Sequence, residues 1–230
     1  MGCPGEYRRA PLGSLRTMST STISLDQLIA WLARFRELVT EKQSYLTELD
    51  SAIGDADHGS NMVRGMNAVV EKVGAAPATA ADELLKSVGM TLVTSVGGAA
   101  GPLYGTLFLR MGVSAGPVTE LDGAAFGAAL RAGLDGVVAR GKAEAEDKTM
   151  FDAINPALDA WDVAVAGGGD IAAAASATLA AAENGRDATE PLVARKGRAS
   201  YLGERSAGHL DPGATSSALL FQALADTVAG

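Results

Sequence analysis

The sequence predicts an all-α protein built as a single domain. Apolar residues recur at spacings of three and four, β-branched runs typical of strands are few, and no linker separates two globular halves. The chain has 230 residues, of which 47 % are apolar, and this is enough to bury one sizeable core. We therefore expect about eight helices in an up-and-down bundle with short loops.

The first four helices are predicted from caps and apolar periodicity. Ser24 and Gln27 form a capping-box pattern that opens a helix ending near residue 45. A second helix begins near Ser60, a third follows Thr79, and a fourth leaves the glycine-rich turn at 97–101. The apolar positions that support these helices are Leu25, Leu28, Ile29, Leu32, Phe35, Leu38, Met62, Val63, Met66, Val69, Leu84, Leu85, Val88, Leu92, Leu103, Leu107 and Met111.

The second half of the chain predicts four more helices. Thr119 and Asp122 form another N-terminal signal, and apolar residues follow it at helical spacing. Asp170 is a good N-cap after three glycines, and the alanine-rich stretch behind it favours close helix packing. The remaining helices are expected over residues 150–166, 170–184 and 214–228.

The ends and the charge of the chain limit its class. Residues 1–20 are predicted to be a disordered tail or an extension, with Met18 a candidate for the natural start, and residues 21–230 form the domain. No charge-free apolar run is long enough for a transmembrane helix. Cys3 is the only cysteine, so no intrachain disulfide forms, which fits a cytoplasmic protein. The net charge of -8 argues against nucleic-acid partners.

The acidic segment at residues 50–61 is the main candidate site. Asp50 is expected at the end of a helix, and an extended backbone would point Asp55 and Asp57 to one side. Converging carboxylates repel one another, and Mg²⁺ relieves this while keeping coordination positions open for phosphate. The alternative is an acidic loop that caps the helix at Ser60. The spacing does not match a calcium-binding EF-hand loop.

Two glycine-rich segments are candidates for binding phosphate. The turn at residues 97–103 precedes a predicted helix, and backbone N–H groups at a helix start attract anions. It does not match the Walker A pattern, and tight helix packing is the alternative explanation. The polar segment at 197–216 has the length of a lid, and Arg198 in it is a candidate for stabilising charge on phosphoryl oxygens. The alternative is a solvated surface loop.

Together, four ordered blocks resemble the DhaL family, the ADP-binding subunit of phosphotransferase-dependent dihydroxyacetone kinases. The blocks are IGDADHGSNM, GGAAGPLYGTLF, DKTMFDAINPA and GRASYLGERSAGHLDPGATSS, and the resemblance covers about residues 24–228. It extends to the C-terminal nucleotide domain of ATP-dependent dihydroxyacetone kinases. The resemblance implies an eight-helix antiparallel, barrel-like bundle with the nucleotide site at one end.

The resemblance also implies roles for individual residues. Asp50, Asp55 and Asp57 would bind two Mg²⁺ ions that bridge the phosphates of ADP or ATP, and no other catalytic residue is assigned. Ala100 stands where the family often has serine, and Glu146 stands where glycine is common. The residues implied to hold the nucleotide are His58, Gly59, Ser60, Asn61, Ala99, Ala100, Gly141, Met150, Arg198, Asp211, Pro212 and Gly213.

The activity implied by the resemblance is phosphoryl transfer from Mg-bound ATP to dihydroxyacetone held on a DhaK-type partner subunit. A DhaM-type phosphohistidine protein would rephosphorylate the bound ADP. A transcriptional regulator is a further candidate partner, and the chain is expected to be a monomer or a homodimer without membrane contact. Three alternatives stay open: an ATP-exchanging kinase domain for another substrate-carrying protein, a non-catalytic module that binds a transcription factor, and a metal-dependent phosphoesterase.

Overall fold

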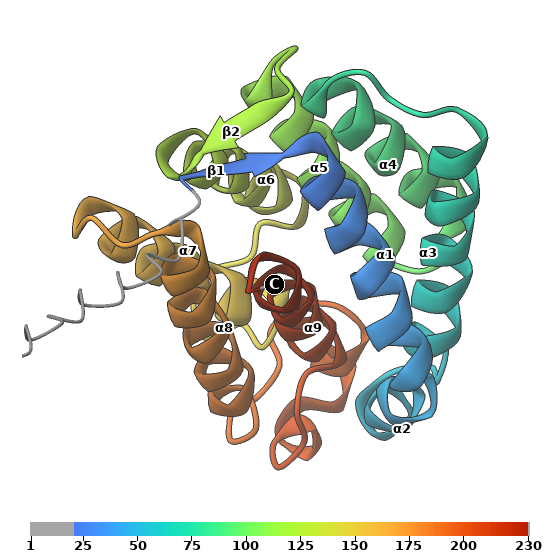
Figure 1. Ribbon diagram of the computed structural model, residues 1–230. Helices are drawn as coiled ribbons and strands as arrows, with labels where there is room; N and C mark the ends of the chain where they lie inside the picture. Colours follow the sequence, from blue (N-terminus) through green and yellow to red (C-terminus); the bar gives the residue numbers. More distant parts are fainter. Residues whose placement is uncertain (1–20, 230) are drawn as a thin grey trace, which may run out of the picture.

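The structure, a computed structural model, describes residues 21–229 and confirms the all-α fold class (Figure 1). The predicted tail or extension at residues 1–20 lies outside the described residues. Within 21–229 the elements are β1 (Thr22–Ser24), α1 (Leu25–Glu41), α2 (Gln43–Ile53), α3 (His58–Ala75), α4 (Ala81–Ser95), α5 (Ala100–Ala115), β2 (Glu120–Asp122), α6 (Gly123–Gly141), α7 (Met150–Ala166), α8 (Ile171–Ala188), the 3₁₀ helix η1 (Arg198–Ser206) and α9 (Pro212–Val228).

The first predicted helix is wrong at its C-terminal end. The capping box at Ser24 is present, but α1 ends at Glu41 and α2 begins directly after Lys42. The backbone of Lys42, with φ -97° and ψ 10°, turns the chain so that α2 packs against α3. The described part of the chain therefore contains nine α-helices, one more than predicted, because apolar periodicity runs on across a one-residue break.

The second correction concerns the segment before α6. Thr119 does not open the helix, because residues Glu120–Asp122 form β2, which pairs antiparallel with β1. Asp122 alone is the N-cap, and its carboxylate accepts a hydrogen bond of 2.7 Å from the N–H of Ala125. Ile23 and Leu121 are register partners, and both are buried. Strands of three residues are too short for their alternation to be recognised in the sequence.

Most helices pack against their neighbours in the chain. The contacts run from α3 through α4, α5, α6, α7 and α8 to α9, and both α3 and α9 also contact α1. In Figure 1, α9 accordingly lies between α8 and α1, so the last α-helix of the described residues packs against the first. No helix between residues 21 and 229 is long and apolar enough to cross a bilayer.

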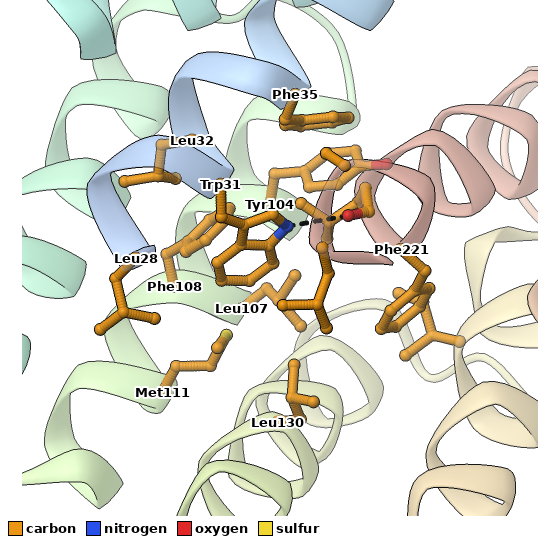
Figure 2. Close-up of a cluster of buried hydrophobic side chains, with 14 of the residues drawn as sticks. Leu28, Trp31, Leu32, Phe35, Tyr104, Leu107, Phe108, Met111, Leu130 and Phe221 are labelled. Atoms are coloured by element: carbon orange, nitrogen blue, oxygen red, sulfur yellow. Dashed lines mark hydrogen bonds between the residues drawn. The ribbon is translucent and has the colours of Figure 1, made fainter. Parts of the chain in front are cut away.

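Two buried tryptophans connect helices in the core, and Trp31 joins the first helix to the last. Trp31 donates a hydrogen bond of 2.8 Å to the carbonyl oxygen of Leu220, which fixes α1 against α9 (Figure 2). Its ring lies 5.9 Å from that of Phe108 and 5.8 Å from that of Phe126. The ring of Phe126 in turn lies 5.2 Å from that of Trp161 in α7. This chain of aromatic contacts forms the centre of the core.

Small residues allow a close contact between α4 and α5. A Cβ atom added at Gly89 would lie 2.7 Å from the carbonyl oxygen of Gly105, which is closer than side-chain carbons approach in proteins. The two backbones therefore touch at this crossing. Glycine at Gly89 and Gly105 therefore serves the packing of α4 against α5.

We expect Gly89→Ala to lower the free energy of unfolding by about 1–3 kcal/mol, because the added methyl group forces α4 and α5 apart. Gly74→Ala is the matched control: nothing lies within 4 Å of its added Cβ, and alanine favours the helix by up to about 1 kcal/mol. Urea denaturation of both variants measures the difference. Equal stability of the two variants would contradict the proposed backbone contact.

Candidate functional site

A cavity of about 430 Å³ brings together the four sequence blocks. Its wall is formed by the end of α2, the starts of α3, α5, α7 and α9, the end of α6, and the start of η1 with the two residues before it. The predicted site residues that line it are Asp50, Asp55, Asp57, His58, Asn61, Ala99, Ala100, Gly141, Met150, Arg198, Asp211, Pro212 and Gly213. The volume suits a small-molecule ligand.

Three carboxylates converge at one side of this cavity. One oxygen from each of Asp50, Asp55 and Asp57 lies within 4.8 Å of the others. Asp50 is buried in the last turn of α2, and its Oδ2 accepts hydrogen bonds from the backbone N–H of Asp57 at 2.8 Å and of His58 at 3.1 Å. Oxygen ligands at this spacing fit a hard divalent cation such as Mg²⁺.

The backbone achieves this convergence by a turn, so the predicted extended conformation between Asp55 and Asp57 is wrong. Ala56 has φ 61°, in the left-handed region that non-glycine residues rarely occupy. A Cβ at Gly54 would lie 2.0 Å from Oδ1 of Asp50, so any side chain there would displace this carboxylate. Local strain and a required glycine therefore mark the turn, as is common at functional sites.

Two of the predicted nucleotide contacts, Gly59 and Ser60, lie outside the cavity lining. A Cβ at Gly59 would lie 2.1 Å from the carbonyl oxygen of Gln43, so this glycine allows α3 to approach α2. Ser60 is exposed, and its hydroxyl donates a hydrogen bond of 2.9 Å to the carbonyl oxygen of Asp57. Their contact with a nucleotide stays a prediction.

A buried chain of polar side chains lies beneath the carboxylates. His58 Nε2 is 2.9 Å from the Ser216 hydroxyl, which is 2.8 Å from the hydroxyl of Tyr104. Tyr104 also lies 3.1 Å from the hydroxyl of Ser217, which donates a hydrogen bond of 2.8 Å to the carbonyl oxygen of Gly213. The chain joins α3, α5 and α9 at the cavity. Sequence analysis missed Tyr104 and the two serines as parts of the site.

Burial shifts the pKa of the titratable groups in this chain. Burial lowers the pKa of His58, although the neighbouring charges of Asp50 and Asp57 act in the opposite direction. Burial also raises the pKa of Tyr104 to about 12, although its hydrogen bonds to the serines favour ionisation. Both side chains are therefore neutral near pH 7, and the negative charge of the cavity resides on carboxylates.

The glycine-rich turn faces the carboxylates. α5 begins at Ala100, and Gly98 has φ 64°, a conformation that favours glycine. A Cβ at Gly98 would lie 4.0 Å from Oδ1 of Asp57, so the turn and the acidic cluster are direct neighbours. An anion here would be attracted both by the N–H groups at the N-terminus of α5 and by a cation bound at the carboxylates.

The segment at residues 189–210, between α8 and α9, contains η1 and carries Arg198. Its guanidinium Nε lies 2.9 Å from Oδ2 of Asp55, and both side chains are partly exposed to solvent. Gly197 and Gly203, with φ 65° and 55°, bend the segment at the start of η1 and within it. The predicted charge-stabilising arginine thus lies beside the acidic cluster.

Part of the cavity lining, which we call the apolar wall, is formed by nonpolar residues. Leu103, Val137, Ala143 and Met150 form it, together with Gly141. Leu103, Val137 and Met150 belong to or pack against the hydrophobic core, so this wall is supported from behind. A cavity lined by both apolar and charged residues suits a ligand that has a flat ring and anionic groups.

Asp211 caps α9 and is buried at the cavity edge. Its carboxylate accepts a hydrogen bond of 2.7 Å from the N–H of Ala214. Burial raises its pKa to about 7 from an ordinary 3.8, while the backbone hydrogen bonds and the charge of Lys148 act against this shift. A carboxyl group with this pKa exchanges its proton near neutral pH.

Comparison with known proteins identifies the family. The DAK2 domain matches residues 52–226. The chain belongs to this family. It is 44 % identical, over 89 % of its length and 97 % of the relative, to the "PEP-dependent dihydroxyacetone kinase, ADP-binding subunit DhaL" of Escherichia coli strain K12. It is 42 % identical, over 90 % of its length and the whole of the relative, to the PTS-dependent counterpart of Lactococcus lactis. The resemblance to the DhaL family is confirmed.

A solved structure has the same fold. The dihydroxyacetone kinase from C. freundii in complex with AMP-PNP and Mg²⁺ superimposes with a TM-score of 0.67 at 24 % identity. The match covers 97 % of this chain but 38 % of the solved chain, so the fold corresponds to one part of that larger protein. This likeness supports the fold of the DAK2 domain described above.

The raised pKa of Asp211 predicts a pH-dependent stability. Folding takes up a proton at Asp211 between pH 3.8 and about 7, so this group's contribution to stability decreases as pH rises through that window and levels off above it. We therefore compare the free energies of unfolding of Asp211→Asn and the wild type in EDTA. The difference between them, in favour of Asp211→Asn, should grow as pH rises to about 7. Each pKa unit corresponds to about 1.4 kcal/mol, so the total difference is a few kcal/mol at most.

Urea unfolding of both proteins between pH 4 and 8 measures this difference. Asparagine still caps a helix, so loss of the cap does not obscure the comparison. A difference that stays constant over the whole pH range would contradict the raised pKa.

Proposed function

We propose that this protein is the nucleotide-binding subunit of a dihydroxyacetone kinase and holds ADP or ATP in the cavity. The observation that carries this proposal is the convergence of Asp50, Asp55 and Asp57 beside the N-terminus of α5. The apolar wall provides a place for the adenine ring, and the acidic side provides the metal site for the phosphates. The names of the E. coli and L. lactis relatives support the same assignment.

In the proposed complex, Asp50, Asp55 and Asp57 hold two Mg²⁺ ions. Bound magnesium neutralises phosphate charge and orients the terminal phosphoryl group for transfer. Three carboxylates balance only part of the charge of two such ions, so the nucleotide phosphates complete the balance. Arg198, which lies beside Asp55, would turn toward the phosphate oxygens. The described site thus needs no general base of its own.

The proposed acceptor is dihydroxyacetone bound to a DhaK-type partner subunit, and a DhaM-type phosphohistidine protein would restore ATP from the bound ADP. The relative in E. coli is named a PEP-dependent subunit, which favours this donor over free ATP.

We further propose that residues 21–230 form the nucleotide-binding domain, that the helix arrangement is barrel-like, and that Gly59 and Ser60 contribute at the nucleotide's edge. An ATP-exchanging kinase domain is the second candidate, since it would use the same site.

Native mass spectrometry of the freshly purified protein separates these candidates. One retained ADP with two Mg²⁺ supports a subunit that keeps its nucleotide as a coenzyme. A nucleotide-free protein that binds and releases added ATP favours the exchanging kinase. A protein that binds no nucleotide contradicts both.

The metal assignment predicts that ADP binding depends on magnesium and on Asp55. Titration of ADP by calorimetry should give a Kd at least about 100-fold higher in EDTA than with Mg²⁺, a loss of roughly 2.7 kcal/mol. Asp55→Asn should weaken Mg-dependent binding to a similar extent and abolish kinase turnover with the partner subunits. Asp135→Asn, a change at an exposed aspartate on α6, is the matched control and should behave as wild type. Equal affinity with and without Mg²⁺ would overturn the assignment.

A further inference from the structure

Lys148 is a fully buried cation that the proposed chemistry does not use. It directly precedes Thr149, the N-cap of α7, and its side chain is 1 % exposed. Within residues 21–229 no carboxylate oxygen lies within ion-pair distance of its ammonium group. Four backbone carbonyl oxygens instead share its three N–H donors: those of Thr189 at 2.8 Å, Glu190 at 3.2 Å, Leu192 at 3.0 Å and His209 at 2.5 Å.

These four carbonyls belong to the two ends of the lid, which we define as residues 189–210. Thr189, Glu190 and Leu192 lie where the chain leaves α8, and His209 lies where it approaches α9. The two ends also bond to each other, because the N–H of Gly208 donates to the carbonyl oxygen of Glu190 at 2.8 Å. The two ends of the lid lie side by side here, and we call this region the neck of the lid. Lys148 lies at the neck and joins both ends of the lid to the start of α7.

The neighbouring residue strengthens this attachment. The carboxylate of Asp147 accepts a hydrogen bond of 2.8 Å from the N–H of Glu144, and its carbonyl oxygen accepts one of 3.1 Å from the N–H of Arg195. The side chains of Arg195 and Lys196 each lie 3.8 Å from the Asp147 carboxylate. Two consecutive residues before α7 thus hold the lid on the side where it enters the cavity wall.

A buried ammonium group is costly unless its hydrogen bonds are satisfied, and an apolar side chain of similar length would fill the same space. The presence of a lysine at position 148 is therefore explained by the hydrogen bonds that its ammonium group makes to the lid carbonyls. Burial lowers the pKa of Lys148, while the charges of Asp211 and Glu190 act in the opposite direction. Gly197–Ala199, which we call the lid tip, lines the cavity and places Arg198 at Asp55.

We propose that Lys148 is a positioning residue that fastens the neck of the lid and thereby keeps the lid tip closed over the cavity. Its side chain also lines the cavity, and the proposed role acts through the lid backbone to which its ammonium group is bonded. The effect on nucleotide retention rests on the proposed function, whereas the effect on the lid itself does not. Loss of the ammonium group frees the two ends of the lid and leaves the carboxylate cluster in place.

Hydrogen exchange of Lys148→Met without nucleotide tests the lid directly. Amides within 189–210 should exchange at least about tenfold faster than in the wild type, while amides of α4 and α5 keep their protection. Lys86→Met, which removes an exposed lysine paired with Asp82, is the matched control and should leave lid exchange unchanged. With Mg²⁺ present, ADP should dissociate at least about tenfold faster from Lys148→Met, with association changed less than about threefold.

A rescue experiment separates the ammonium group from simple packing. Lys148→Cys in a Cys3→Ser background is alkylated with 2-bromoethylamine while unfolded and then refolded, which restores an ammonium group at nearly the lysine length. Slow lid exchange should return after alkylation. The proposal would be overturned by unchanged lid exchange in Lys148→Met or by failure of the rescue. It would also be overturned if the circular dichroism of Lys148→Met showed that the helices of the whole protein had unfolded. Faster lid exchange in a protein whose wild type does not bind ADP would support the lid proposal and reject the proposed function.

Discussion

The mutual repulsion of three carboxylates at the junction of α2 and α3 is the constraint around which the site is built. Asp50 is held by two backbone N–H groups, and Ala56 adopts a left-handed conformation so that Asp55 and Asp57 converge with it. Gly59 lets the two helices approach closely enough for this turn to form. The fold therefore stores an unfavourable charge arrangement that a divalent cation and a neighbouring guanidinium group can relieve.

The start of α9 is the second element on which the site depends. Asp211 caps it, Ser216 and Ser217 bind the polar chain beneath the carboxylates, and Leu220 accepts the hydrogen bond from Trp31. The same helix thus faces the cavity with its first turns and the hydrophobic core with the rest (Figure 2). Movement of α9 would therefore disturb both the core and the polar groups that position His58.

The cavity is formed partly by helices of the core and partly by the lid, which is held to them by hydrogen bonds. The acidic cluster and the apolar wall lie on helices packed into the core, whereas the lid is a long segment without a core of its own. Its attachment at Lys148 and Asp147 makes its position dependent on the start of α7. A ligand in the cavity would be enclosed by core-packed helices and by this segment, an arrangement that enzymes with closing loops use to retain a ligand.

The sequence by itself determined the helices with strong caps and periodicity, the acidic segment, the glycine turn and the DhaL resemblance, because these depend on residues close together in the chain. It did not determine the break at Lys42 or the three-residue strands, since neither changes the local apolar pattern. Only the tertiary structure placed Ser216 against His58, 158 residues away, and Lys148 against the carbonyls of the lid. Such contacts depend on how helices cross and where loops return, and this is decided by packing of the whole core.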